Sequence, residues 1–217
     1  MKGIRQYIRE PINSLTHGIG ALASVIGLFL LLNEALSHGS ISHIIAFSIF
    51  GSSMILLYTS STIFHGLPVK AKTQKLFQKM DHAMIYVLIA GTYTPICLLV
   101  LDGSWKWGFF ITVWTIAVLG MIKKFLCIGT PGWLSIFLYL GMGWMAVLLF
   151  PTLMERMPLA FIGWIILGGL SYTFGALIYG FEKPNPIPNW FGHHEIWHLF
   201  VMLGTFSHFW AIYFYLT

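Results

Sequence analysis

Charged side chains divide this chain into long apolar segments. Seven stretches without Asp, Glu, Lys or Arg occupy most of it, at residues 11–33, 35–69, 82–101, 107–122, 125–154, 157–181 and 196–217. A helix needs about 20 apolar residues to cross the hydrocarbon of a bilayer, and all the stretches except the fourth reach that length. The fourth is flanked by Lys106, Lys123 and Lys124, whose long side chains can extend to the interfaces. The pattern therefore predicts seven transmembrane helices.

Composition agrees with this prediction. Hydrophobic residues make up 57% of the 217 residues and charged residues only 9%, whereas a soluble protein has about 25% charged residues. A soluble helical bundle would need a polar face on each helix, and the apolar stretches have none. We therefore expect an all-α integral membrane protein, a single seven-helix transmembrane domain over residues 1–217 with helices near 13–36, 41–65, 81–101, 105–122, 132–153, 158–180 and 193–215.

The basic residues predict the orientation. Of the twelve Lys and Arg residues, Lys106 and Arg156 fall on one side of a seven-helix arrangement, and the others fall on the opposite side: Lys2, Arg5, Arg9, Lys70, Lys72, Lys75, Lys79, Lys123, Lys124 and Lys183. The positive-inside rule then places the N-terminus in the cytoplasm and the C-terminus outside a cytoplasmic (inner) membrane. This asymmetry accounts for most of the formal charge of +5, so we expect membrane lipids and no nucleic acid as partners. The segment 68–79 is predicted to be an inner loop that contacts anionic headgroups.

Polar residues inside membrane helices are costly and are therefore functional candidates. Ser61 and His65 end the second predicted helix, Asp81 opens the third, and His194 and His198 open the seventh. His65, Asp81, His194 and His198 all fall at the cytoplasmic ends of their helices. A spacing of four, as in Ser61/His65 and His194/His198, puts two side chains on one helix face. Three neutral imidazoles and a water form an open zinc site, and an aspartate beside it can hold or deprotonate the water.

Each candidate also has an ordinary structural explanation. Asp81 is suited to cap the start of a helix. His208 lies about 15 Å along its helix from His198, too far to share one metal, and is interpreted as a packing residue. The remaining histidines are interpreted as hydrogen-bonded side chains near the interfaces: His17, His38, His43, His82 and His193.

A zinc-peptidase interpretation competes with this one. The segment from His194 to His198 has the sequence HEIWH, which satisfies the H-E-x-x-H pattern, and Leu101-Asp102-Gly103 looks like the LDG element of intramembrane metalloproteases. Asp102, however, falls at the opposite membrane face from His194 and precedes the motif instead of following it. A peptidase is therefore the lesser alternative.

The polar residues as a set resemble the progestin and adipoQ receptor family, whose bacterial branch is called haemolysin III. The matching motifs are Ser61-x-x-x-His65, Asp81 and His194-x-x-x-His198, supported by the sequences NSLTHG at 13–18, GTYTP at 91–95 and IWHLFV at 196–201. The resemblance covers the chain from about residue 12 to residue 213.

The resemblance implies a seven-helix bundle with a zinc ion near the cytoplasmic face. It assigns His65, His194 and His198 as zinc ligands, Asp81 as the residue that holds the water beside the zinc, and Ser61 as the family's serine. Glu195 falls at a variable position of the third motif. The family includes receptors and cytolytic proteins, is related to ceramidases that cleave lipid amides, and has been linked to membrane lipid homeostasis.

Three functions therefore remain open from the sequence. The first is a zinc-dependent hydrolase of lipid amide or ester bonds, with Asp81 as the general base and Ser61 assisting. The second is a lipid sensor or receptor in which the zinc is structural. The third is a cytolysin or pore, which the absence of a polar stripe along any predicted helix disfavours. The sequence predicts neither a soluble protein partner nor an oligomeric state.

Overall fold

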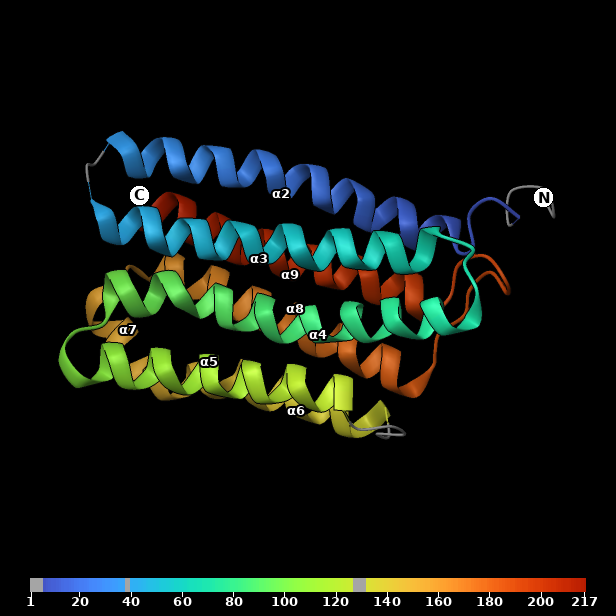
Figure 1. Cartoon of the computed structure of the whole chain (residues 1–217). Coiled ribbons are helices and arrows are strands. Elements are labelled where there is room, and N and C mark those ends of the chain that lie inside the picture. Colours follow the sequence, from blue (N-terminus) through green and yellow to red (C-terminus); the bar gives the residue numbers. More distant parts are fainter. Residues whose placement is uncertain (1–5, 38–39, 127–131) are drawn as a thin grey trace.

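Helices make up nearly all of the chain that the computed structural model describes, which is residues 6–37, 40–126 and 132–217. The long helices lie side by side along one axis, and the N- and C-terminal ends lie at opposite ends of the bundle (Figure 1). In chain order the elements are α2 (Pro11–Ser37), α3 (Ile41–Gly66), α4 (Ala71–Pro95), the π-helix η1 (Ile96–Val100), α5 (Gly103–Leu126), α6 (Gly132–Trp144), the 3-10 helix η2 (Met145–Leu149), α7 (Phe150–Arg156), α8 (Leu159–Phe181) and α9 (His193–Tyr215).

Six of the described helical segments are long and apolar enough to cross a membrane. They are α2, α3, α4 continued by η1, α5, the run from α6 to α7, and α8. Many of their large apolar side chains face outward, among them Leu22, Phe29 and Ile111, which are 60–70% exposed; such surfaces suit lipid and not water. Helix α9 is 23 residues long, the same length as α8. It is not among the six, because several His residues and Glu195 make it less apolar. The predicted seventh span stays a prediction.

The structure corrects the predicted start of the third helix. We expected a loop up to Lys79 and a helix from residue 81, but α4 begins at Ala71. A search for charge-free stretches misses residues 71–80 because this segment contains Lys72, Lys75 and Lys79. Lysine is nevertheless compatible with a helix, and these three recur at helical spacing. Asp81 consequently lies inside α4, and its interpretation as the N-terminal cap of that helix is wrong.

Two helices predicted to be uniform contain a change of helix type. The first follows Pro95, which lacks a backbone N–H; the chain continues as a π-helix in which the Leu101 N–H donates to the Ile96 carbonyl, 3.2 Å away. The second is η2, between α6 and α7, where Pro151 follows at the start of α7. The predicted inner loop at 124–131 falls largely outside the described residues.

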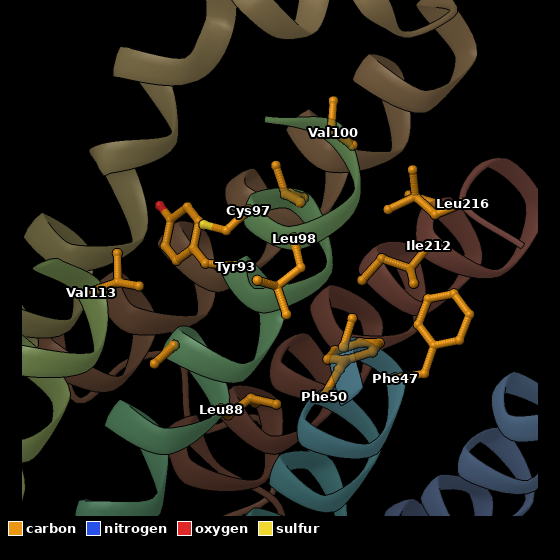
Figure 2. Packing of buried hydrophobic residues seen from close by; sticks show 14 of the residues in the cluster. Phe47, Phe50, Leu88, Tyr93, Cys97, Leu98, Val100, Val113, Ile212 and Leu216 are labelled. Atoms are coloured by element: carbon orange, nitrogen blue, oxygen red, sulfur yellow. The ribbon is translucent and has the colours of Figure 1, made fainter. Parts of the chain in front are cut away.

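Packing among the helices forms one apolar core and a continuous ring. Helix α2 lies against α3 and α9, α3 against α4, α4 against α5 and α6, and α8 against α6 and α9. In the half of the bundle shown in Figure 2, Phe47 and Phe50 of α3, Leu98 of η1 and Ile212 of α9 meet at its centre. The opposite half, where α3 ends and α9 begins, contains the predicted metal ligands His65, His194 and His198.

Candidate metal centre

Three histidines meet where α3 ends and α9 begins. His65, His194 and His198 each offer a ring nitrogen, and these nitrogens all lie within 4.8 Å of one another. The three ring centroids form a triangle in which every side is 4.9 Å. His65 and His198 are 0% and 2% exposed, so the cluster faces the interior of the bundle. The structure therefore brings together the three residues that were predicted as metal ligands.

Local sequence explains why these helices end at the cluster. Pro68 cannot continue α3, so the helix stops just after His65 and leaves this side chain in its last turn. Helix α9 begins immediately before His194, and its first turn is fixed by Glu195, whose Oε2 accepts the Gly192 N–H at 2.8 Å. The side-chain oxygen of Asn185 accepts the His193 N–H at 3.0 Å, which ties the proline-rich connector to the same helix start.

A carboxylate orients His65. The Nδ1 atom of His65 lies 2.5 Å from Oε2 of Glu10, and the Glu10 N–H donates to the His65 carbonyl at 2.9 Å. Arg9 pairs with the same carboxylate at 3.0 Å and Asn13 donates to it at 3.2 Å. Burial of Glu10 raises its pKa, but the hydrogen bond and the charge of His65, followed by Arg9 and Asn13, outweigh burial and hold the pKa at about 2. Glu10 is therefore ionised at neutral pH.

The first turns of α2 also contact His198. The hydroxyl of Thr16 lies 3.4 Å from Nδ1 of His198, and the ring of His17 stacks on the His198 ring with the centroids 3.6 Å apart and the planes at 9°. His17 in turn places its Nδ1 at 2.7 Å from the hydroxyl of Ser61. Glu10 and Thr16 were not predicted as site residues, and His17 was interpreted as an ordinary interfacial histidine. Asn13 and His17 lie on one face of α2, but Glu10 precedes the helix, so helical spacing did not indicate it.

Asp81 and Ser61 share a cavity with the cluster but are not members of it. Both line a cavity of about 1090 Å³ together with His194 and His198, and the carboxyl group of Asp81 interacts with Ser61 and His65. From this polar end the cavity continues between α4, α6, α8 and α9, where apolar side chains line most of it. A polar end and a long apolar part are what an amphiphilic ligand requires.

The remaining predicted histidines lie outside the cluster. His193 contacts Asn185 and the His82 carbonyl accepts the Tyr139 hydroxyl at 2.9 Å. Nε2 of His208 lies 3.2 Å from the carbonyl of Ile165, so this residue bridges α9 and α8. His43 lies near the start of α3, whose other end carries His65, and His38 lies outside the described residues.

The geometry of this cluster fits a zinc ion. Tetrahedral zinc with Zn–N distances of 2.0–2.1 Å needs nitrogens about 3.3 Å apart, which small side-chain adjustments of this triangle reach. Nε2 of His65 is buried, and no described residue is hydrogen-bonded to it, as expected for a ligand atom whose partner is a metal. A carboxylate on the other ring nitrogen is the usual support of a metal-ligating histidine.

The peptidase alternative does not fit these positions. The Glu195 side chain folds back onto the backbone of Gly192 and is not part of the cluster. Asp102 lies between η1 and α5, where it pairs with Arg156 at the end of α7. The two acidic residues that a peptidase would use are therefore both engaged elsewhere.

Fold and site together define a class of protein: a helical membrane protein with a histidine cluster at one end of an apolar cavity. The haemolysin-III-related family model matches residues 5–209, and this chain belongs to that family. It is similar to Hemolysin-3 of Bacillus cereus, with 38% identity over 216 residues, covering 99% of this chain and 95% of the relative. A Hemolysin-3 homolog of Bacillus subtilis (strain 168) is 40% identical over 209 residues, or 96% and 95% of the two chains. The human monocyte to macrophage differentiation factor is 28% identical over 212 residues, or 94% and 83%.

Proposed function

We propose that this protein is a zinc-dependent hydrolase that cleaves an amide or ester bond of a membrane lipid. The observation that carries the proposal is the three-histidine triangle at the polar end of the long apolar cavity, with Asp81 and Ser61 lining the same end. His65, His194 and His198 hold the zinc. The role in membrane lipid homeostasis that the family suggests is compatible with such a reaction.

Each residue has a task in this reaction. A zinc ion held by His65, His194 and His198 would supply Lewis acidity, which would polarise the scissile carbonyl and lower the pKa of water. The Asp81 carboxylate accepts the proton of the attacking water and passes it to the leaving nitrogen or oxygen. The Ser61 hydroxyl, held by His17, orients Asp81. The apolar part of the cavity receives the acyl chain and keeps bulk water away from it.

The proposal includes an orientation in the membrane. Helix α9 is the seventh span, the N-terminus is cytoplasmic and the C-terminus is outside, so the cluster lies near the cytoplasmic face of the inner membrane. Its support is that basic residues lie near the cluster, as the positive-inside rule requires: Arg9 donates to the Phe64 carbonyl beside His65, and Lys72 and Lys124 line the cavity with His194 and His198.

A lipid sensor with a structural zinc is the alternative. Structural zinc sites usually have four protein ligands, and the cluster of described residues has three, which favours the hydrolase. The cytolytic activity suggested by the names of the Bacillus relatives has less support, because the cavity lining is mostly apolar and a water-filled pore needs a polar one.

The variant Asp81→Asn tests the hydrolase proposal. The asparagine keeps the size of the side chain but cannot act as a base, so zinc content should stay at the wild-type level while hydrolysis of a fluorescent N-acyl amide lipid or acyl ester falls at least about 100-fold. A sensor with structural zinc predicts no hydrolysis by wild-type protein with either substrate. Hydrolysis that survives in Asp81→Asn would refute the role of Asp81.

A further inference from the structure

Lysine side chains surround the polar end of the cavity. Lys72, Lys75 and Lys79 of α4 and Lys124 of α5 all belong to its lining. Asp81 is the one carboxylate residue among the described lining residues. Its carboxyl group interacts with Ser61 and His65. The mouth of the cavity therefore carries an excess of positive charge.

Lys79 and Lys124 hydrogen-bond only to neutral groups, and Asp81 lies near enough to Lys124 to attract its charge without forming an ion pair. The Lys124 ammonium donates to the Ser135 hydroxyl at 2.7 Å and lies 5.7 Å from the centre of the Tyr139 ring. The Lys79 ammonium donates to the Phe125 carbonyl at 2.9 Å. Neither forms an ion pair with a carboxylate of the described chain. Each ammonium has three donors, so both retain donors for a further acceptor.

The positive-inside rule explains why lysines occur at this end but not why these side chains line the cavity. Lys123 carries the same charge one position earlier and is not part of the lining. The Lys124 ammonium is part-buried and forms no ion pair with the described residues. A partly desolvated cation is unfavourable, and an anion in the mouth would reduce that cost. A zwitterionic headgroup would also bring a cation, for which the mouth offers no carboxylate beyond Asp81.

We propose that the mouth of the cavity binds the phosphate headgroup of an anionic amphiphile whose hydrocarbon chain occupies the apolar part. Lys79 and Lys124 donate to the phosphate oxygens, and the more exposed Lys72 and Lys75 add charge around them. This inference rests on the proposed function in one respect, because it names an anionic, phosphate-bearing lipid as the substrate class of the hydrolase.

Native mass spectrometry of the full chain in maltoside micelles tests the proposal. The probes are hexadecyl phosphate, hexadecyl phosphocholine and inorganic phosphate, and the variants are Lys124→Gln and Lys79→Gln, with Lys123→Gln as the charge-matched control. We expect hexadecyl phosphate to bind more tightly than hexadecyl phosphocholine. Its affinity should fall about tenfold in Lys124→Gln and in Lys79→Gln, the loss of one hydrogen bond to a charged group, and should not change in Lys123→Gln.

Three results would overturn the proposal. Equal affinity for the two amphiphiles would remove the preference for an anion. Equal weakening in all three variants would mean that surface charge alone attracts the probe. Binding of inorganic phosphate as tight as that of hexadecyl phosphate would make free phosphate the ligand instead of a lipid headgroup. Hexadecyl phosphate contains no amide or carboxylic ester, so its binding does not depend on hydrolysis, and a protein that binds it without hydrolysing lipids would refute only the proposed function.

Discussion

The contact between Glu10 and His65 joins residues 55 positions apart and determines which ring nitrogen faces the cluster. A neutral imidazole donates from one nitrogen and accepts at the other. Because Nδ1 of His65 is next to the Glu10 carboxylate, a neutral His65 that donates from Nδ1 would keep the lone pair on Nε2, the ring nitrogen available to a metal. The same carboxylate is fixed by Arg9 and Asn13, so it is a rigid support for the ring.

Replacing Glu10 should weaken zinc binding without emptying the site. In Glu10→Gln the amide oxygen can still accept from Nδ1, but the negative charge that makes the ring more basic is lost. We expect zinc affinity, measured by competition with a chelator, to fall about 10-fold in Glu10→Gln and up to about 100-fold in Glu10→Ala. Glu195→Gln is the control, because Glu195 precedes a ligand histidine of the cluster directly but only caps its helix. Unchanged affinity in Glu10→Ala, or equal losses in Glu10→Gln and Glu195→Gln, would contradict the orienting role.

Predictability at this scale depends on where the partners lie in sequence. His194 and His198 could be paired because a spacing of four has the same meaning in every helix. Joining them with His65 needed the assumption that the ends of two helices share one depth in the membrane. Glu10 could not be found in this way, because its contact with His65 depends on how the chain before α2 packs against the end of α3.

Among the elements, α9 carries two of the three clustered histidines, so its position against α8 controls the site. The contact is close at Gly175 of α8: a Cβ there would lie 2.7 Å from Cβ of Phe200 and 2.9 Å from the ring of Trp197. Trp197 precedes His198 directly. A side chain at position 175 therefore pushes on the turn of α9 that presents the cluster.

We expect Gly175→Ala to destabilise the protein and to loosen the metal site. Overpacking a tight contact costs about 1–3 kcal/mol, so the melting temperature in detergent should fall by several degrees, and zinc affinity should fall with it. Gly163→Ala on the same helix is the matched control, because no neighbouring atom lies within 4 Å of a Cβ there. An unchanged melting temperature and zinc affinity in Gly175→Ala would show that α9 is not held at this contact.

The start of α4 shows what charge-free stretches cannot predict about elements. They mark the part of a helix that lies in hydrocarbon, but α4 extends ten residues before Asp81 through a segment that contains lysines. The changes of helix type at η1 and η2 were not predicted either, since Pro95 alone does not decide between a kink and a π-helix.

At the scale of the whole molecule, the open question is whether α9 crosses the membrane. Six helical segments satisfy the length and composition of a span, and α9 has the same length but more polar residues. Helix α9 packs along α8 and α2, so several of its polar residues face other helices and not lipid: His198, Thr205 and Ser207 are buried. A helix inside a bundle tolerates such residues, so composition alone underestimates how well α9 can span a membrane.

A topology experiment distinguishes seven spans from six. With seven, the termini lie on opposite sides, so alkaline phosphatase fused after Thr217, which is active only outside the cytoplasm, should be active. The same fusion at the N-terminus, as the matched control, should be inactive. A cytoplasmic C-terminus, detected by fluorescence of a fused green fluorescent protein and an inactive phosphatase, would mean an even number of spans and would contradict the proposed topology.

The most direct test of the central claim is the metal content of the detergent-purified protein. Elemental analysis should find about one zinc per chain in the wild type, the ratio implied by one cluster, and almost none in the His194→Ala/His198→Ala double variant. The helical circular dichroism of the variant should remain that of the wild type. Zinc absent from wild-type protein purified without chelators and offered zinc in excess, or zinc retained in full by the double variant, would contradict the metal centre and with it the proposed hydrolase.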